Sequence, residues 1–350
     1  MDIQKSVQKF CTTSAENLGS IDIEVLDTEK NFQYNKHLRE LKDAFKFIDS
    51  DFKFFEYIKN LNIFQEPTIL ILENELVTKV TTEETRKSCL VLNPIEFQIR
   101  SFFQTSDILQ KTLEYTAKLE QATDIQNFVN GSLWQNIKTK YIQNEYNYVL
   151  PLFLYADEFE VNDPQSSHSK VDSICGIYFN FPTLPVEYRS KLCNIFVGGF
   201  IRKVVINETG VSKFVEELLI PFKKLENEGL VFQLKSHCVR IRFVLCLVQG
   251  DNLGVHSLLQ LSSGFNANYY CRFCKRHRTQ MQVDDEEHKN CLRNIENYEE
   301  DVLKDRHSLT GISGPSPFNQ LQSFHVIENP SIDVMHDMYS NGACRAAIFG

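Results

Sequence analysis

The chain has 350 residues, which is more than one ordinary domain needs and enough for two. Hydrophobic residues make up 42% of it and aromatic residues 12%, so it can bury a sizeable core. The net charge of −9 argues against a uniformly basic coat for nucleic acid, although a local basic patch can still attract phosphates.

The sequence contains no sign of membrane insertion or secretion. No apolar run reaches the roughly 18 residues that a membrane span needs, and the N-terminal sequence MDIQKSVQKF is too polar for a signal peptide. We therefore expect an intracellular protein, nuclear or cytoplasmic, that is not secreted and has no transmembrane segment. Ten cysteines in such a protein predict reduced thiols and a metal site rather than a disulfide framework.

Residues 1–145 are predicted to form a mainly helical N-terminal region. From Lys36 to Leu61 apolar residues recur every three or four positions, and the same spacing returns from Pro94 to Gln121 and from Asp124 to Ile142. Ile69–Leu72 is the short strand that we expect between these helices.

From residue 146 to 270 the pattern changes to that of a strand-rich core. Val149–Tyr155 is a dense apolar run followed closely by Asp157, so a strand delivers an acid at its end. After a polar loop at Asn162–Lys170, the next expected elements are a strand at Ile174–Phe181, a strand with a helical start at Leu192–Ile206 and a helix at Gly210–Asn227.

The segment that follows is predicted to form the central strand of this core. Val239–Val248 is apolar at almost every position, which is typical of a strand buried on both faces. Asp251 follows this strand and precedes a helical run, Leu253–Leu261, and open α/β sheets place their chemistry at such strand ends. Asp157 and Asp251 are therefore candidate catalytic residues, and the alternative for each is a turn or helix-cap aspartate.

The order of these elements resembles the ribonuclease H-like nuclease fold, in which one catalytic acid lies on the first strand and the next follows the fourth. Two Mg²⁺ (or Mn²⁺) ions about 4 Å apart require carboxylates on adjacent central strands. We therefore expect an α/β fold with a ribonuclease H-like core, a mixed sheet with helices, into which a zinc-knuckle region is inserted and which the helical N-terminal module precedes.

A cluster of cysteines and histidines follows the core segment. Cys271 and Cys274 form a Cys-x-x-Cys pair, and His288 and Cys291 form a second pair, a spacing that suits tetrahedral Zn²⁺. Either His288 or His277 completes the ligand set. In the alternative interpretation, the cysteines are buried apolar residues and His288 lies in a solvated loop. The same stretch contains a cluster of basic residues, which either contacts phosphates or lies on a solvent-exposed surface: Arg272, Lys275, Arg276 and Arg278.

Residues 271–322 are expected to form an inserted Cys/His and polar region, largely on the surface, and residues 323–350 the start of a late core helix. Pro330–Asp337 opens this helix, in which Asp333 and Asp337 can share one face. Both are candidates for a third catalytic acid, and the alternative is a capping or surface role. Since no terminating element follows, we expect a truncated chain, whose third acid can lie beyond its last residue.

Three segments together resemble the transposases of the CACTA (En/Spm-like) DNA transposons and their animal relatives. They are Leu154–Val161, Gly250-Asp251 with Asn268–Cys274, and Ile332–Asp337. The resemblance implies a ribonuclease H-like core that cuts and joins DNA strands with acidic residues and a divalent metal. It assigns Asp157 as the first acid, Asp251 as the second, and Asp333 or Asp337 as the third.

Two functions follow from this resemblance. The first is a transposon-derived DNA transposase of the DDE type, either active or an incomplete copy. Its partner would be DNA, at the transposon ends and at the target, and it could form a homo-oligomer. The second is a non-catalytic, zinc-containing protein derived from a transposase that binds DNA or protein partners. The ordered acids favour the first function, whereas the net charge of −9 favours the second.

Overall fold

The computed structural model describes Gln33, Lys36 and residues 50–340, except 80–81, 106, 161–172, 190, 236, 265 and 284–285. The chain divides into two compact units, Met1–Glu66 and Pro67–Gly350. In the first unit, helix α3 (Asp51–Asn60) begins at Ser50, whose hydroxyl accepts a hydrogen bond from the backbone N–H of Lys53. Most of the helical stretch predicted N-terminal to α3 lies outside the described residues.

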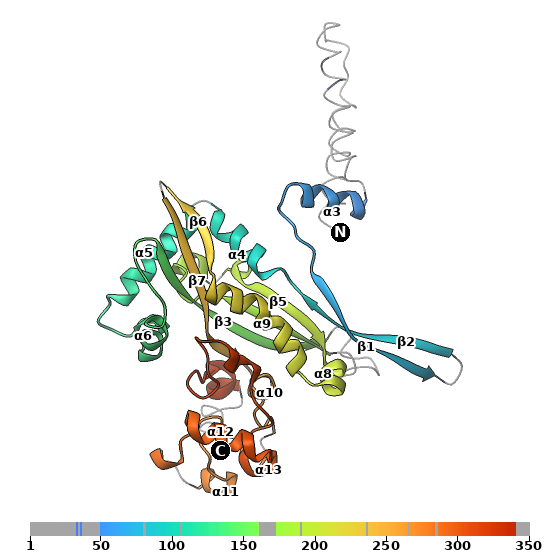
Figure 1. Cartoon of the computed structure of the whole chain (residues 1–350), viewed down its shortest axis with the longest axis vertical. Coiled ribbons are helices and arrows are strands. Elements are labelled where there is room, and N and C mark those ends of the chain that lie inside the picture. The colour runs from blue at the N-terminus through green and yellow to red at the C-terminus, as the bar shows by residue number, and fades with distance from the viewer. Residues whose placement is uncertain are drawn as a thin grey trace. The chain divides into compact units, whose positions relative to one another are not determined.

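The second unit is built on a mixed seven-stranded sheet, in the order β1-β2-β5-β4-β3-β7-β6 (Figure 1). Neighbouring strands pair antiparallel, except for β3 and β7, which run parallel. The strands are β1 (Thr68–Lys79), β2 (Thr82–Leu92), β3 (Asn147–Glu160), β4 (Ser173–Asn180), β5 (Phe196–Arg202), β6 (Leu230–Leu234) and β7 (His237–Gly250). The predicted α/β class with a mixed sheet and helices is thus confirmed.

Strands β3 and β7 lie deep in this sheet and are buried on both faces, as the sequence predicted for β7. Alternate residues of each strand belong to different apolar clusters, because side chains of a strand point to opposite faces. Leu152 and Phe243 belong to the larger cluster, whereas Val149 and Val244 belong to the smaller one.

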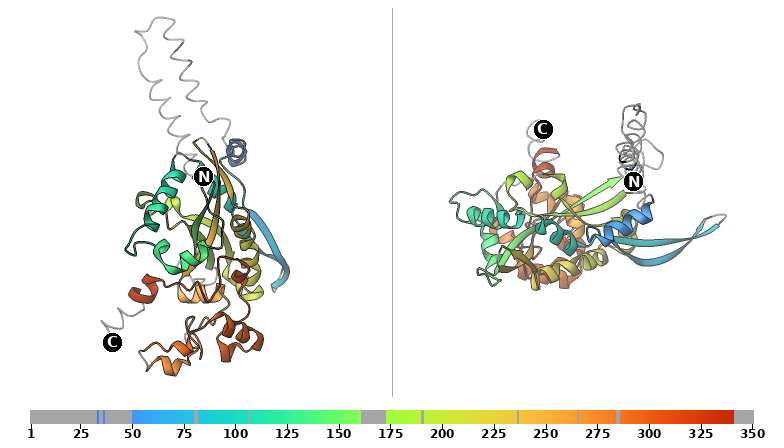
Figure 2. Two further views of the ribbon diagram at one scale, coloured as in Figure 1. Left: turned by 60° about the vertical axis from the view of Figure 1, so that its left-hand side comes forward. Right: turned by 90° about the horizontal axis from the view of Figure 1, so that it is seen from above.

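Helices cover both faces of the sheet (Figure 2). The larger cluster includes buried residues of α4 (Ile95–Gln104) and α9 (Ser212–Asn227), and the smaller one includes residues of α6 (Ser132–Lys138). Trp134 of α6 is fully buried, as expected for a core residue. The remaining helices before β6 are α5 (Ile108–Glu120), η2 (Phe128–Asn130), α7 (Val186–Arg189), η3 (Leu192–Asn194) and α8 (Lys203–Thr209).

The segment after β7 packs partly into the main core. Tyr298, Ile312 and Phe318 are buried there, so the expected surface position of this stretch is wrong for these three residues. Their apolar side chains are spaced irregularly among glycines, prolines and charged residues, which hid them in the sequence. The elements here are α10 (Asn252–Leu258), α11 (Arg278–Met281), η4 (Lys289–Cys291), α12 (Ile295–Lys304), α13 (His307–Thr310), η5 (Pro317–Gln320) and a π-helix, η6 (Val334–Ser340).

Three strands differ from the sequence expectation. β1 extends well beyond the predicted Ile69–Leu72, β2 was not predicted, and β6 forms a hairpin with β7. The loop expected at Asn162–Lys170 and the chain after Ser340 lie outside the described residues. Of the helices in the described part of the chain, none is both long and apolar enough to cross a membrane.

Candidate functional site

The parallel pairing of β3 with β7 brings the first two predicted acids to one edge of the sheet. Ala156 of β3 pairs with Gly250 of β7. Asp157 directly follows Ala156, and Asp251 directly follows Gly250. The predicted adjacency of their strands is therefore confirmed. Asp157 is exposed and Asp251 is half-buried.

Asp251 also caps a helix. Its Oδ1 atom accepts a hydrogen bond of 2.6 Å from the backbone N–H of Gly254, at the start of α10. The capping role considered from the sequence is thus present in the structure. This bond uses one oxygen of the carboxylate and orients it, and because a carboxylate has a second oxygen, capping and metal binding are compatible roles.

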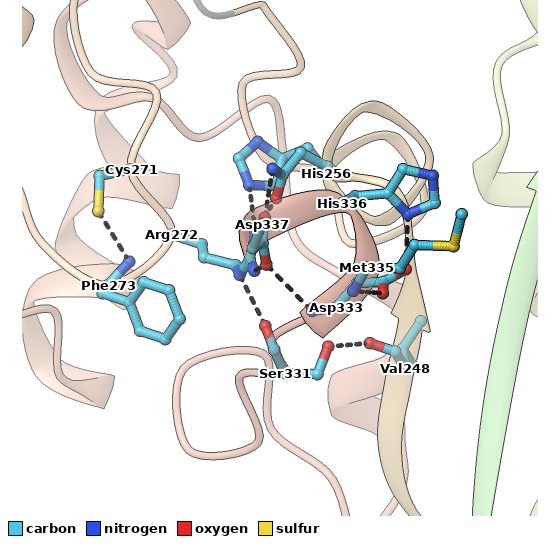
Figure 3. Close-up of polar contacts among 11 residues, drawn as sticks. Val248, His256, Cys271, Arg272, Phe273, Ser331, Asp333, Met335, His336 and Asp337 are labelled. Atoms are coloured by element: carbon cyan, nitrogen blue, oxygen red, sulfur yellow. Dashed lines mark hydrogen bonds and ion pairs between the residues drawn. The ribbon is translucent and has the colours of Figure 1, made fainter. Parts of the chain in front are cut away.

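Asp333 directly precedes η6 and forms a pair with His336. The Nδ1–H group of His336 donates to Oδ2 of Asp333 over 2.7 Å, and the backbone N–H of Met335 donates to Oδ1 (Figure 3). This hydrogen bond raises the pKa of His336, and the charges of Asp333, Asp251 and Asp157 add to the rise, whereas burial opposes it.

The charges of all three acids act on the side chain of Tyr155. Burial raises the pKa of its hydroxyl, and the negative charges of Asp157, Asp333 and Asp251 raise it further. These three carboxylates therefore act on the same phenol as well as on the same imidazole. Tyr155 was not identified from the sequence as part of the site, although it lies on the same strand as Asp157, two residues earlier.

Asp337, the other candidate for the third acid, is bonded on both oxygens. Its Oδ1 accepts from the Asn252 side chain over 2.6 Å, and its Oδ2 accepts from Nη2 of Arg272 over 3.1 Å. Oδ2 also accepts from the backbone N–H of Asp333 over 3.0 Å. These bonds give Asp337 a role in holding the segment that carries Asp333. Both oxygens of Asp333 are bonded as well, but its charge, unlike that of Asp337, acts together with those of Asp157 and Asp251 on Tyr155, which makes Asp333 the better candidate.

Arg272 is the centre of this buried network (Figure 3). Its side chain is 8% exposed, donates from Nε to the carbonyl oxygen of Ser331 over 3.0 Å, and donates from Nη1 to the Asn252 side chain. The sequence placed Arg272 in a basic cluster that faces phosphates or water, and this is wrong because Asp337 neutralises it inside the protein. Its position between two cysteines and two aromatic residues was the only signal of burial.

His256 packs against this arginine. Its Nδ1–H group donates to the carbonyl oxygen of Ser262 over 2.6 Å, and its Nε2 atom lies 3.4 Å from Nη1 of Arg272. Burial lowers the pKa of His256, the bond to Ser262 opposes the effect, and the positive charge of Arg272 adds to it. The neutral imidazole is therefore the form that fits beside the guanidinium group.

Cys271 and Cys274 form a thiol pair on the loop that carries Arg272. The backbone N–H of Phe273 donates to the Cys271 sulfur over 3.3 Å. Burial raises the pKa of Cys274, the backbone N–H of Arg276 opposes the rise by bonding its sulfur, and the Cys271 thiol adds to it. Such N–H groups stabilise a thiolate, which is the form that binds a metal.

The second predicted ligand pair lies beside this loop. The backbone N–H of Lys275 donates to the carbonyl oxygen of Cys291 over 2.8 Å, and the carbonyl oxygen of His288 accepts from Cys291. The Nδ1 atom of His277 caps α11 by accepting from the backbone N–H of Thr279. His277 is half-buried, whereas His288 is exposed.

The donor types fit the expected metals, but the described residues do not bring three donors together. Carboxylate oxygens suit Mg²⁺ and Mn²⁺, and thiolates with imidazole suit Zn²⁺. In the part of the chain that the structure describes, no three His, Cys, Asp or Glu side chains gather closely enough to hold a metal ion. The metal sites therefore stay predictions.

Neither a protein-family model nor a curated protein sequence matches this chain. The assignment of a function accordingly rests on the geometry of the acids and on the order of the strands.

Proposed function

We propose that the protein is a transposon-derived DNA transposase with a ribonuclease H-like core, which cleaves DNA strands and transfers them at Asp157, Asp251 and Asp333. The observation that carries this proposal is the parallel pairing of β3 with β7, which ends in one acid on each strand. The strand order supports it as well. The antiparallel β3-β4-β5 meander and the crossover through α9 to β7, which runs parallel beside β3, agree with the order that the resemblance implies, whereas β6 is an additional strand between α9 and β7.

The residues of the acidic site have separate tasks in this proposal. Asp157 and Asp251 would hold Mg²⁺ or Mn²⁺ from adjacent strands, and the Gly254 N–H group orients Asp251. A metal ion held there would supply the Lewis acidity that phosphate attack by water or by a DNA 3′-hydroxyl needs. His336 orients Asp333 through its Nδ1–H group.

The cysteine cluster would bind one Zn²⁺ through Cys271, Cys274 and Cys291, with His277 or His288 as the fourth ligand. The hydrogen bond from the backbone N–H of Lys275 to the carbonyl oxygen of Cys291 supports this proposal, because it holds the loop of Cys271 and Cys274 beside Cys291. A zinc ion there would fix the loop from which Arg272 reaches Asp337. The proposed partner of the whole site is nuclear DNA, at transposon ends and at the target.

The alternative is a non-catalytic, zinc-containing relative that binds DNA or protein. Two observations favour it: the net charge of −9, and the engagement of both Asp333 oxygens by His336 and by the Met335 N–H group. In that case the cysteine cluster would bind zinc while the acids serve only to cap and orient local structure.

The experiment that tests the proposal is Mn²⁺-dependent nicking of duplex DNA carrying the ends of the host element. Asp157→Asn and Asp251→Asn should each reduce nicking at least about 100-fold, since each removes a metal ligand. Glu160→Gln, an exposed acid near the end of the same strand, is the matched control and should nick like the wild type. Equal nicking by all four proteins would overturn the proposal, and zinc binding without any nicking would select the alternative.

A further inference from the structure

A pocket of about 250 Å³ lies beside the acidic site. It is built by the same elements as that site, because Asn252 follows Asp251 directly and Asp337 lies one turn after Asp333. The residues that line it are Asn252, His256, Tyr270, Cys271, Arg272, Phe273, Ile332 and Asp337.

The mouth of this pocket is apolar and exposed. Phe273 is 38% exposed and Ile332 is 56% exposed. Exposed apolar groups that line a concave site next to polar groups are typical of a ligand contact. Tyr270 adds a second aromatic wall.

The aromatic wall is held rigidly. The guanidinium group of Arg272 lies 5.0 Å from the centre of the Phe273 ring, and its bonds to Ser331 and Asp337 fix it there (Figure 3). The positive charge of Arg272 is neutralised by Asp337. The pocket therefore offers a fixed ring face without a free charge, which suits a flat, uncharged group.

We propose that this pocket takes an unstacked nucleobase of the DNA strand on which the acids act, and that the base stacks on Phe273. The inference rests on the proposed function, because the acids define where the strand runs. An aromatic face accepts any base, since every base has a π-face. Half-buried Lys275, in the same loop, and half-buried Arg278, the first residue of α11, supply positive charge for the phosphates of such a strand.

The position of the pocket explains why a base and not a whole duplex is the occupant. A base that is stacked inside a duplex cannot enter a pocket beside the helix. Enzymes that bind a single base therefore first turn its nucleotide out of the stack. With the pocket built on the residues that neighbour Asp251 and Asp333, an extruded base would hold its own phosphate near these acids. The captured base would thereby set which phosphate is attacked.

The test uses the full chain and a single-stranded DNA overhang that carries 2-aminopurine, with Ca²⁺ present to prevent cleavage. Stacking on an aromatic ring quenches this fluorophore, so the titration reports base capture directly. Phe273→Ala should weaken capture roughly ten-fold, whereas Phe273→Trp should retain it. Phe55→Ala in α3, an equally exposed phenylalanine, is the matched control and should bind like the wild type.

A second variant, Ile332→Ala, removes the opposite apolar wall and should weaken capture less than Phe273→Ala. Wild-type quenching by Phe273→Ala with unchanged affinity would overturn the inference, as would displacement of the overhang by an equal concentration of a free deoxynucleoside monophosphate. Mn²⁺ affinity should be unchanged in the Phe273 variants. If the wild-type protein does not nick DNA but still captures the base through Phe273, the catalytic proposal is wrong and the base-binding pocket is supported.

Discussion

Gly250 approaches Ala156 so closely that a Cβ atom on Gly250 would lie 2.5 Å from the carbonyl oxygen of Ala156. Gly250 also has a φ of +149°, which side chains rarely allow. The residue that ends β7 therefore has to be glycine if Asp251 is to follow at the level of Asp157.

Gly250→Ala is expected to destabilise the fold and to move Asp251. The backbone strain and the clash together should lower the free energy of unfolding by about 1–3 kcal/mol. Gly264→Ala is the control, because nothing lies within 4 Å of the Cβ position there. Urea denaturation measures both variants, and equal stability of the two would contradict the close approach.

Arg272→Gln is expected to be strongly destabilising. It leaves the half-buried carboxylate of Asp337 without its charged partner. Breaking a fully buried pair typically costs about 3–5 kcal/mol, so the loss should approach the lower end of that range. Adding Asp337→Asn should recover part of that loss, because the unpaired charge is then gone. Arg278→Gln, which removes a single bond to the Asn266 carbonyl oxygen, is the control. If the double variant is no more stable than Arg272→Gln alone, the two residues are not coupled as the structure implies.

His256 should make the protein less stable in mild acid. Its pKa is lowered in the folded state, mainly by burial, while the unfolded chain has a histidine pKa of about 6.5. As the pH falls below that value, the unfolded state takes up the proton first, so stability is lost until the folded pKa is reached. The slope reaches at most about 1.4 kcal/mol per pH unit for one proton.

The substitution His256→Gln should flatten this slope, measured as unfolding free energy from pH 7 to pH 5. The groups that face His256 are Arg272, Arg293 and Asp337, and all three keep their places in the variant. His237→Gln, at an exposed site on β7, should keep the wild-type slope. A wild-type slope in His256→Gln would show that another group carries the acid sensitivity.

Zinc should protect the cysteine cluster from alkylation. Cys271, Cys274 and Cys291 are half-buried and should become labelled by iodoacetamide only after a chelator removes the metal. Cys193 and Cys238 are exposed and should be labelled in either state. Mass spectrometry of the labelled peptides checks this, and identical labelling of the three cluster cysteines with and without chelator would count against a zinc site.

A buried cysteine provides the internal reference for that experiment. Burial raises the pKa of Cys175 to about 12, and the negative charge of Glu158 contributes to the rise. The thiol of Cys175 should therefore stay unlabelled at pH 8 whether or not a chelator is present.

The strand pattern of the core was predictable because its signal is local. Val239–Val248 is apolar throughout, and Asp157 and Asp251 stand at the ends of two such runs, so strand burial and acid placement followed from neighbouring residues. β1 was predicted only over its apolar run, Ile69–Leu72, whereas its second half and most of β2 are rich in Glu, Lys and Thr and are defined by the pairing of the two strands. Neither segment alone contains a sequence signal for that pairing.

The role of Arg272 was not predictable for a related reason. Whether an arginine is buried depends on a partner, and Asp337 lies 65 residues away in the chain. Asp337 lies 65 residues from Arg272 and 85 residues from Asn252 in the chain. Asp333 and Asp337 could not be ranked from the sequence, and the structure distinguishes them by their partners, which are Asn252 and Arg272 for Asp337 and His336 for Asp333.

The parallel pairing of β3 with β7 also orders events during synthesis. β3, β4 and β5 are consecutive strands in the chain and neighbours in the sheet, so this meander forms through local contacts. β7 is made after α9 and leaves the ribosome on the order of ten seconds after β3. Until then β3 is an apolar edge with unpaired backbone groups, a template for wrong partners. A chain that stops before β7 would keep that edge, and aggregation of such a nascent chain is the expected fate.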